Sequence, residues 1–268
     1  MQQNNSSLRP QLLFFSIIAV LFVSGILYGK RSGLVPTDMP GFVTQQRLPD
    51  FASITDVDEK KAAFFDFLQP YVDAENRQIL AHRVELERIL DKLRNGQGFS
   101  RRESAFISSI SEEYQIDTVA QETVSHLRQL LRRVDILPSS LVLAQAANES
   151  AWGTSRFAVE GNNLFGQWCY TSGCGLVPNQ RLAGADHEVK AFDSVAESIH
   201  AYFMNLNTFP SYQKLRRIRQ QMREQGREID SISLTEGLDS YSERGEAYIE
   251  ELQSMINFND LQNRDGQS

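Results

Sequence analysis

Residues 143–155 read LAQAANESAWGTS, and residues 161–166 follow closely with GNNLFG. Small and apolar residues dominate the first stretch, which carries a single carboxylate, Glu149, near its end. The second stretch, rich in glycine and asparagine, predicts a loop suited to gripping a polar ligand. An apolar setting raises the pKa of a carboxyl group and keeps it protonated near neutral pH, as a general acid requires. We therefore expect the chemistry of this chain at Glu149.

Helical periodicity precedes this stretch. We expect a helix from about residue 58 that Pro70 interrupts, and then a longer helix that ends at Asn95-Gly96. Ser100 and Glu103 form a capping-box pattern that predicts the start of another helix. Asp117 is expected to cap a further helix over residues 118–133. These upstream helices carry no chemical motif and indicate a scaffold.

The residues after this stretch are also predicted to form helices, with one non-helical region among them. Pro138 suits the first position of the helix that carries Glu149, which is expected to stop near Gly153. Residues 167–192 lose the helical period and gather turn residues, which predicts a small β-lobe. Ser194 and Glu197 form a second capping box, and further helices are expected at about 212–224 and 243–258. The fold class is therefore mostly α with a small β-lobe.

The N-terminus carries the signal for the compartment. Residues 12–28 are an uncharged, largely apolar run, at the short edge of a membrane-spanning helix. No A-x-A-like cleavage site follows, so we expect residues 1–31 to be an uncleaved membrane anchor, with a cleaved secretory signal as the alternative. Residues 32–56, with several prolines and glycines, predict a flexible linker. Because large domains translocate largely regardless of flanking charge, we place the body outside the cytoplasm.

Charge and cysteine usage exclude several classes of function. The net charge of −7, without a clustered basic stripe, argues against a nucleic-acid binder. Cys169 and Cys174 are the 2 cysteines, and without nearby histidines they make a poor metal site. We expect them to close a tight loop as a disulfide, with free buried thiols as the alternative. The 4 histidines are scattered, so we expect neither a metal ion nor another cofactor.

The sequence resembles the glucosaminidase family of peptidoglycan hydrolases. The resemblance rests on AQAANESAWGTSR, on NNLFG and on the distal segment YSERGEAYIEEL at residues 241–252, and it spans about residues 137–258. It implies a lysozyme-like helical domain over residues 137–260, whereas the helical extension over residues 57–136 rests on the helical pattern alone and is not explained by the resemblance. It also implies an endo-β-N-acetylglucosaminidase that hydrolyses β-1,4 bonds in glycan strands. The expected location is the cell envelope, anchored in the inner membrane with the body in the periplasm, or secreted if the signal is cleaved.

The resemblance and the residues together nominate catalytic groups. Glu149 is the candidate general acid, with a helix-end carboxylate paired to Arg156 as the alternative reading. Glu188 and Asp186 lie on the predicted β-lobe, where the family carries an acidic residue; the alternative is two solvated strand carboxylates. If neither serves, the N-acetyl group of the sugar itself can act as the nucleophile. Tyr241 matches a tyrosine that lines the family's cleft, although a tyrosine there can also be core packing.

Four further residues are candidates for binding the sugar chain. Asn162 and Asn163 can hydrogen-bond hydroxyl and acetamide groups in both directions. Phe165 would shape the floor of the site, with plain core packing as the alternative. Trp168 is the candidate for stacking on a sugar face, and the Cys169–Cys174 loop would hold its ring in place.

Two other functions remain open at this point. A muramidase or lytic transglycosylase would act on the same substrate with one glutamate followed by serine. The NNLFG sequence argues against a transglycosylase, since those enzymes tend to carry a Gly-Leu-Met-Gln type sequence there. A non-catalytic cell-wall-binding protein is the third reading, and an intact Glu149 counts against it.

Overall fold

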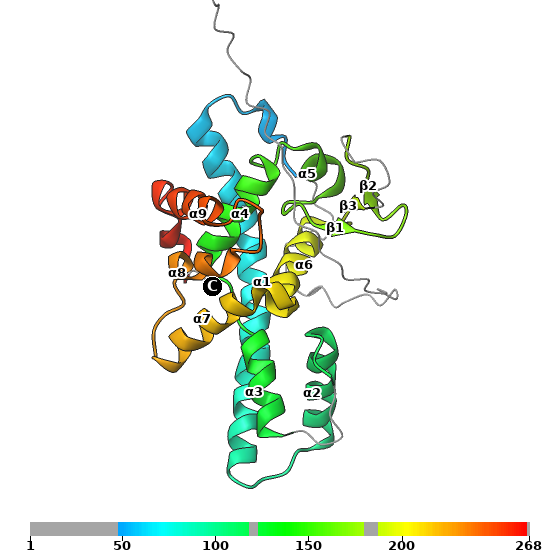
Figure 1. Ribbon diagram of the computed structural model, residues 1–268, viewed down its shortest axis with the longest axis vertical. Helices are drawn as coiled ribbons and strands as arrows, with labels where there is room; N and C mark the ends of the chain where they lie inside the picture. The colour runs from blue at the N-terminus through cyan, green and yellow to red at the C-terminus, as the bar shows by residue number, and fades with distance from the viewer. Residues whose placement is uncertain (1–47, 118–122, 180–186, 267–268) are drawn as a thin grey trace, which may run out of the picture.

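The computed structural model describes residues 48–117, 123–179 and 187–266. In these ranges α-helices dominate, and one small antiparallel sheet stands beside them (Figure 1). The predicted anchor at residues 1–31, most of the predicted linker and Asp186 lie outside the described residues. None of the helices in the described ranges combines the length and the apolar character needed to cross a membrane.

Helix α1 (Val57–Arg94) is the longest element and runs through the molecule from end to end (Figure 1). The Asp56 side chain caps its start by accepting a hydrogen bond from the amide of Glu59. The expected interruption at Pro70 is wrong, because the helix continues through this residue. Pro70 is exposed, so water can solvate the carbonyl that it leaves without a partner, while buried Leu68 and Val72 hold the helix on both sides.

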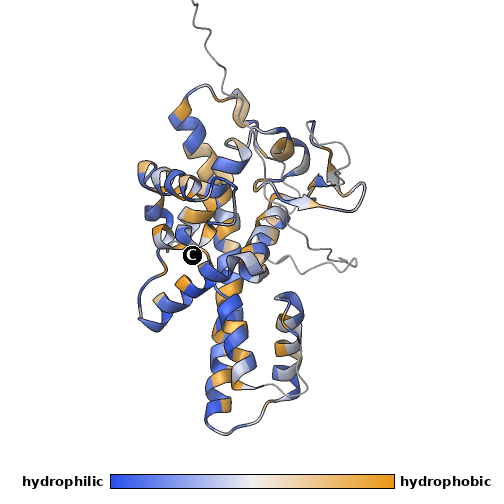
Figure 2. Cartoon of the chain, in the orientation of Figure 1, coloured by the Kyte–Doolittle hydropathy of each residue, from blue (hydrophilic) through white to orange (hydrophobic). Residues whose placement is uncertain are grey.

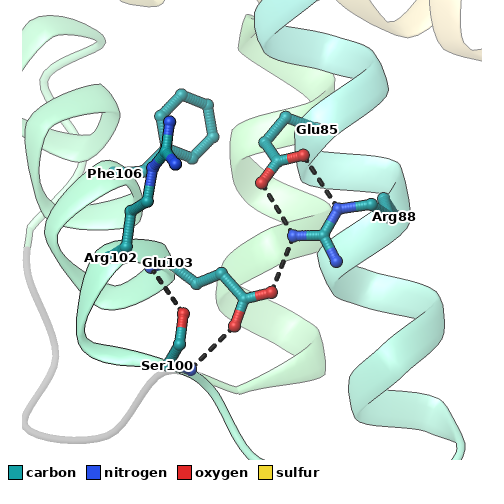
Figure 3. Close-up of a pocket in the computed structure, with 6 residues that line it drawn as sticks. All are labelled: Glu85, Arg88, Ser100, Arg102, Glu103 and Phe106. Carbon is teal, nitrogen blue, oxygen red and sulfur yellow. Dashed lines mark hydrogen bonds and ion pairs between the residues drawn. The ribbon is translucent and has the colours of Figure 1, made fainter.

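The second half of α1, with α2 (Arg101–Glu113) and α3 (Val124–Arg133), forms an arm at one end of the molecule (Figure 1). The capping box is confirmed, since Ser100 and Glu103 bond to each other's backbone amides. Glu103 also binds Lys92 (2.7 Å) and Arg88 (2.6 Å) of α1, which ties α2 to α1 beside the pocket in Figure 3. These bonds hold the pKa of Glu103 well below its ordinary value, and the bond from Lys92 has the largest effect.

Helix α3 begins later than expected. Its N-cap is Thr123, whose hydroxyl accepts a hydrogen bond from the amide of His126. Asp117 therefore does not cap this helix, and residues 118–122 lie outside the described ranges. A β-branched hydroxyl residue three positions before His126 offers the same cap as an aspartate, and the sequence alone gave no reason to prefer it.

Helix α4 (Ser139–Ser150) is the central helix, and every residue in it except Asn148 and Glu149 is buried. Pro138 is its N-cap rather than its first residue, and proline offers no side chain that can cap. The missing cap comes from the end of the chain, where Asp265 accepts bonds from the amide (2.8 Å) and the hydroxyl (2.7 Å) of Ser140. The C-terminal segment η4 (Leu261–Arg264) is thereby held against α4.

One hydrophobic core crosses the predicted boundary at residues 136 and 137. Helix α1 packs against both α4 and α6 (Val195–Thr208), and its residues Phe64 and Leu68 share a buried cluster with Leu143 and Ala147 of α4. Figure 2 shows apolar residues along α1 and α4, whereas α7 (Gln213–Glu224) is largely hydrophilic. The first half of α1 therefore belongs to the same packing unit as α4.

The remaining elements surround α4 and complete the fold. The predicted β-lobe is a sheet in the order β1-β3-β2, with Val189 opposite both Trp168 and Leu176. A mostly helical chain with a small sheet confirms the fold class and fits a lysozyme-like helical domain. The other elements are η1 (Phe51–Ser53), α5 (Arg156–Gly161), β1 (Trp168–Cys169), β2 (Gly175–Leu176), β3 (Glu188–Lys190), η2 (Pro210–Tyr212), α8 (Ser231–Thr235), η3 (Glu236–Leu238) and α9 (Glu246–Phe258).

Candidate active site

The turn that ends α4 explains the sequence ESAWG. Ser150 turns its hydroxyl back into the helix and accepts a bond from the amide of Gly153 (2.8 Å). Ala151, Trp152 and Gly153 all have left-handed backbone angles, with φ of 50°, 58° and 74°. A left-handed angle costs a non-glycine residue roughly 1–2 kcal/mol. A Cβ at Gly153 would lie 2.7 Å from the Phe51 ring, so only glycine fits. The helix is thus forced to end at Ser150, one residue after Glu149.

The two carboxylate oxygens of Glu149 have different surroundings. Oε1 accepts a hydrogen bond from the Tyr248 hydroxyl (2.8 Å) and a longer one from the Asn148 amide (3.3 Å). Oε2 makes no hydrogen bond with any of the described residues. A Cβ placed on Gly166 would lie 4.0 Å from Oε2, so the end of the NNLFG loop faces this oxygen. One oxygen is therefore held by the protein, and the other borders the loop.

The electrostatic setting of Glu149 favours its protonated form. Burial raises its pKa, and this outweighs the opposing effect of the hydrogen bonds from Tyr248 and Asn148. The alternative partner, Arg156, instead pairs with Glu160 (3.3 Å). No cationic side chain among the described residues forms an ion pair with Glu149. The expected environment of a general acid is present at this carboxyl group.

A chain of buried polar side chains leads to Glu149. The Tyr202 hydroxyl donates to Oε1 of Gln145 (2.5 Å), and Nε2 of Gln145 donates to the Tyr248 hydroxyl (2.9 Å). Tyr248 then donates to Glu149. Burial raises the pKa of both tyrosines well above the ordinary value, so their hydroxyls keep their protons. These three side chains come from α6, α4 and α9.

Tyr241 lies beside these hydrogen-bonded side chains. Its ring stacks on Tyr248, with ring centroids 5.5 Å apart and planes inclined by 5°. Its hydroxyl donates to the carbonyl of Phe165 in the NNLFG loop (3.1 Å). Burial, together with the nearby charge of Glu149, raises the pKa of Tyr241 well above its ordinary value. Tyr241 thus joins the segment before α9 to the loop that faces the acid.

Asn163 shapes the NNLFG loop from within. Its amide nitrogen donates to the carbonyls of Gln167 and Lys190 (both 2.8 Å), and its oxygen accepts from the amides of Phe165 (3.3 Å) and Gln167 (3.1 Å). The side chain is buried and these bonds occupy its donors and acceptor. The structure therefore shows Asn163 joining the loop to β3, and its contact with a sugar stays a prediction.

Asn162 and Phe165 have comparable contacts within the protein. Asn162 adopts a left-handed φ of 50° at the end of α5 and donates to the carbonyl of Phe192 (2.9 Å). The Phe165 ring is buried and stacks on Tyr202 at 4.0 Å. Phe165 thus matches the core-packing alternative, and it supports the buried tyrosine that begins the polar chain. A direct role of either residue in sugar binding stays a prediction.

The β-lobe contains the cysteine loop and Glu188. Cys169 and Cys174 are joined by a disulfide. Glu188 is buried, and its oxygens accept from the amides of Gly173 (3.0 Å) and Gly175 (2.8 Å). Both carboxylate oxygens therefore hold the disulfide loop, which differs from the solvated carboxylate weighed as the alternative. Glu188 also lies near the two sulfurs, but disulfide sulfurs carry no thiolate to bind a metal ion.

Trp168 stands on strand β1 at the side of the same loop. Its ring is half-buried and stacks on His187, with centroids 4.0 Å apart and planes inclined by 9°. The imidazole thus fixes the plane of the indole. Whether a sugar stacks on this ring stays a prediction.

Sequence reasoning missed the residues that hold the acid. Gln145 and Tyr248 both lie inside the quoted motifs, and a buried amide in an otherwise apolar helix was the available signal for Gln145. Tyr202 lies in an ordinary amphipathic helix and gave no signal. Because Tyr248 is 99 positions from Glu149, only the fold brings the two together.

A mostly helical domain with a small sheet fits a lysozyme-like helical fold, and the raised-pKa carboxyl group beside the fixed loop is its candidate proton donor. The pattern of the Glucosaminidase family, described as mannosyl-glycoprotein endo-beta-N-acetylglucosaminidase, matches residues 124–261. Protein bax of Escherichia coli strain K12 is 35% identical over 201 residues, covering 75% of this chain and 70% of that protein. No solved structure matches the chain. The chain belongs to the glucosaminidase family.

This family assignment confirms the resemblance and supports a peptidoglycan-related glycosidase. The matched range begins at residue 124, earlier than the expected start at 137, and so includes α3. That earlier start agrees with the packing of α3 on α1, the helix that also supports α4.

Proposed function

We propose that this protein is an endo-β-N-acetylglucosaminidase that hydrolyses β-1,4 bonds in the glycan strands of peptidoglycan. The observation that carries the proposal is the carboxyl group of Glu149, whose pKa is raised and whose Oε2 borders Gly166 and has no hydrogen-bond partner among the described residues. A glycosidic bond breaks when an acid protonates the leaving oxygen. Glu149 meets this requirement, and family membership supports the substrate class.

In the proposed reaction, the proton on Oε2 passes to the glycosidic oxygen as the bond to the anomeric carbon breaks. The electron pair of that bond remains on the leaving oxygen, and the sugar carbon acquires positive character. A water molecule then supplies the new hydroxyl and returns a proton to the ionised carboxylate. The Tyr248 hydroxyl stabilises that carboxylate through its bond to Oε1.

The second group in the reaction is a separate question. Both oxygens of Glu188 are engaged by backbone amides, which favours either Asp186 or the N-acetyl group of the substrate. Tyr241 stacks on the tyrosine bonded to Glu149, and this position supports the proposal that it stabilises the acetamido group or the developing charge. Replacing Asp186 with asparagine tests the choice, because turnover persists if the substrate's own acetamide serves.

The proposed reaction is tested by the ends that it leaves. Purified peptidoglycan is digested with the full-length chain and with its Glu149→Gln variant, reduced with borohydride and examined by mass spectrometry. We expect reduced N-acetylglucosamine ends with the wild type and none with the variant. Reduced or anhydro muramic acid ends would instead assign a muramidase or a lytic transglycosylase. Binding without any new ends would assign a wall-binding protein.

We also propose that residues 1–31 anchor the protein in the inner membrane with its body in the periplasm. The uncharged run at residues 12–28 supports the anchor, and a disulfide is favoured in an oxidising compartment. Fractionation tests this placement. We expect the full-length chain to stay with membranes in high salt and its cysteines to resist alkylation until reduced. Recovery in the soluble fraction with alkylated cysteines would contradict it.

A further inference from the structure

The hydrogen bonds around Glu149 have a fixed direction. Tyr248 has a single hydroxyl proton, and it accepts a bond from Nε2 of Gln145 (2.9 Å). Its proton is therefore directed to Oε1 of Glu149 (2.8 Å). Gln145 presents Nε2 to Tyr248 because its oxygen accepts from the Tyr202 hydroxyl. The hydroxyl of Tyr202 thus sets the direction of every hydrogen bond in the series that leads to Glu149.

This direction decides which oxygen of Glu149 can carry a proton. Oε1 accepts from Tyr248 and from Asn148, so a proton on Oε1 would face two donors. Oε2 has no partner among the described residues and faces Gly166. We propose that Gln145 and Tyr202 are positioning residues, which orient the Tyr248 hydroxyl so that the transferable proton of Glu149 is confined to Oε2. This inference rests on the proposed function, since the proton is the one given to the leaving oxygen.

Gln145 and Tyr202 are suited to this task because neither is exposed. Both side chains are fully buried, so water does not compete for the hydrogen bonds that link them. Tyr202 is held in turn by the Phe165 ring, which stacks on it. Neither residue hydrogen-bonds to Glu149, and their hydrogen-bonded link to its carboxyl group runs through Tyr248.

The first variant to test is Gln145→Met, which keeps the length of the side chain and removes both polar groups. The Tyr248 hydroxyl can then turn and accept a hydrogen bond from a proton held on Oε1 of Glu149. We expect the pKa of Glu149 to rise, because its protonated form gains an acceptor. We also expect kcat at low pH to fall about tenfold, because the proton now occupies the wrong oxygen. KM should not change, since the fully buried Gln145 side chain presents no surface to a substrate.

The direct readout is the titration of the Glu149 carboxyl carbon. Full-length protein labelled with ¹³C-glutamate is titrated by NMR, with the resonance assigned by its absence in Glu149→Gln. Tyr202→Phe removes a single oxygen atom and should raise the pKa in the same direction by less. Tyr114→Phe removes the hydroxyl of a buried tyrosine that takes no part in the hydrogen bonds from Tyr202 to Glu149, and it should leave the titration of Glu149 unchanged.

A double variant separates positioning from packing. Tyr248→Phe removes the donor to Oε1 and should itself raise the pKa of Glu149. Because Gln145 acts through Tyr248, adding Gln145→Met to Tyr248→Phe should produce no further shift. Additive shifts would mean that Gln145 acts by packing and would overturn the inference. An unchanged pKa in Gln145→Met would overturn it as well.

The two proposals can fail separately. The titration needs no turnover, so the expected pKa shifts in a protein that releases no sugar ends would retain the positioning chain and refute the hydrolase. Release of the expected ends, with the same pKa in Gln145→Met and the wild type, would retain the hydrolase and refute the positioning role.

Discussion

Two carboxyl groups at opposite ends of α4, the buried Asp135 and the half-buried Glu149, have opposite surroundings. Asp135, just before α4, contacts Arg223 (2.8 Å), Arg83 (3.2 Å) and Arg219 (3.9 Å). Burial alone would raise its pKa, but Arg219 and the other two arginines outweigh that effect and lower it. Glu149, at the far end of α4, forms no ion pair with the described residues, and burial raises its pKa. The same helix therefore separates an ionised group from one that favours its proton.

The difference between the two carboxyl groups shows that removal from water has two outcomes in this fold, a structural ion-pair cluster at Asp135 and a raised pKa at Glu149. The arginines around Asp135 come from α1 and α7, so this cluster joins the arm to the rest of the core. Fully paired buried charges of this kind hold elements in one arrangement. The half-buried carboxyl group of Glu149, which has no cationic partner among the described residues, contributes no such link, and its raised pKa instead suits proton transfer.

The largest expected effect comes from removing the acid. Glu149→Gln keeps the shape of the side chain but carries no transferable proton. We expect the release of reducing ends to fall about a thousandfold, the scale of general acid catalysis. The melting temperature should stay the same or rise, because a half-buried carboxyl group that forms no ion pair with the described residues is gone. Activity close to wild type would contradict the role of Glu149.

The second effect is on stability rather than on turnover. Asp135→Asn leaves Arg219 buried without its countercharge, and we expect unfolding free energy to fall by about 3 kcal/mol or more. Urea denaturation measures this loss, while turnover per folded molecule should stay near wild type. Asp91→Asn is the matched control, because its pair with Arg94 is exposed and should contribute nothing measurable. Equal stability losses in both variants would refute the comparison.

The third-largest expected effect is on activity, and Gly166 and Gly226 are the matched pair of glycines that tests it. Both have φ of 65°, so alanine at either site should cost about 1 kcal/mol of stability. Only at Gly166 would the new methyl group lie beside Oε2 of Glu149. We expect Gly166→Ala to lose between about tenfold and a hundredfold in activity, and Gly226→Ala to lose none. Equal activities would show that the loop does not border the reacting proton.

The smallest effect is the dependence of stability on pH. Because the folded pKa of Glu149 is raised, ionisation destabilises the folded state above the ordinary glutamate pKa. The stability of Glu149→Gln should therefore equal that of the wild type in acid. It should exceed that of the wild type as pH rises through the raised pKa of folded Glu149. Asp135 behaves oppositely, since its folded pKa is lowered and its contribution is lost as pH falls through that value. Melting temperatures of Glu149→Gln and Asp135→Asn across pH measure both trends.

Local sequence rules predicted much of this arrangement. The end of α4 near Gly153 follows from the glycine and the polar residues around it, and the Ser100–Glu103 box follows from spacing three residues apart. The three-stranded lobe lies within residues 167–192, where the helical period is lost. Each of these features is decided by residues close together in the chain.

Features that depend on distant partners were not predictable in the same way. The continuity of α1 through Pro70 depends on packing that outweighs one lost hydrogen bond. The cap on α4 comes from Asp265, 125 positions away from Ser140. Asn163 was expected to face a sugar, yet its amide holds the backbone of the loop and of β3. Periodicity and motif spacing contain no information on such long-range bonds.

The central claim is that Glu149 supplies the proton for glycan cleavage from a carboxyl group kept protonated by burial. The most direct measurement compares the pH dependence of peptidoglycan digestion with the NMR titration of Glu149 in the wild-type protein. We predict that digestion declines with rising pH at the same midpoint as the loss of the Glu149 proton, above the ordinary glutamate value. A Glu149 pKa at or below the ordinary value, or digestion that continues unchanged through its titration, would contradict the account.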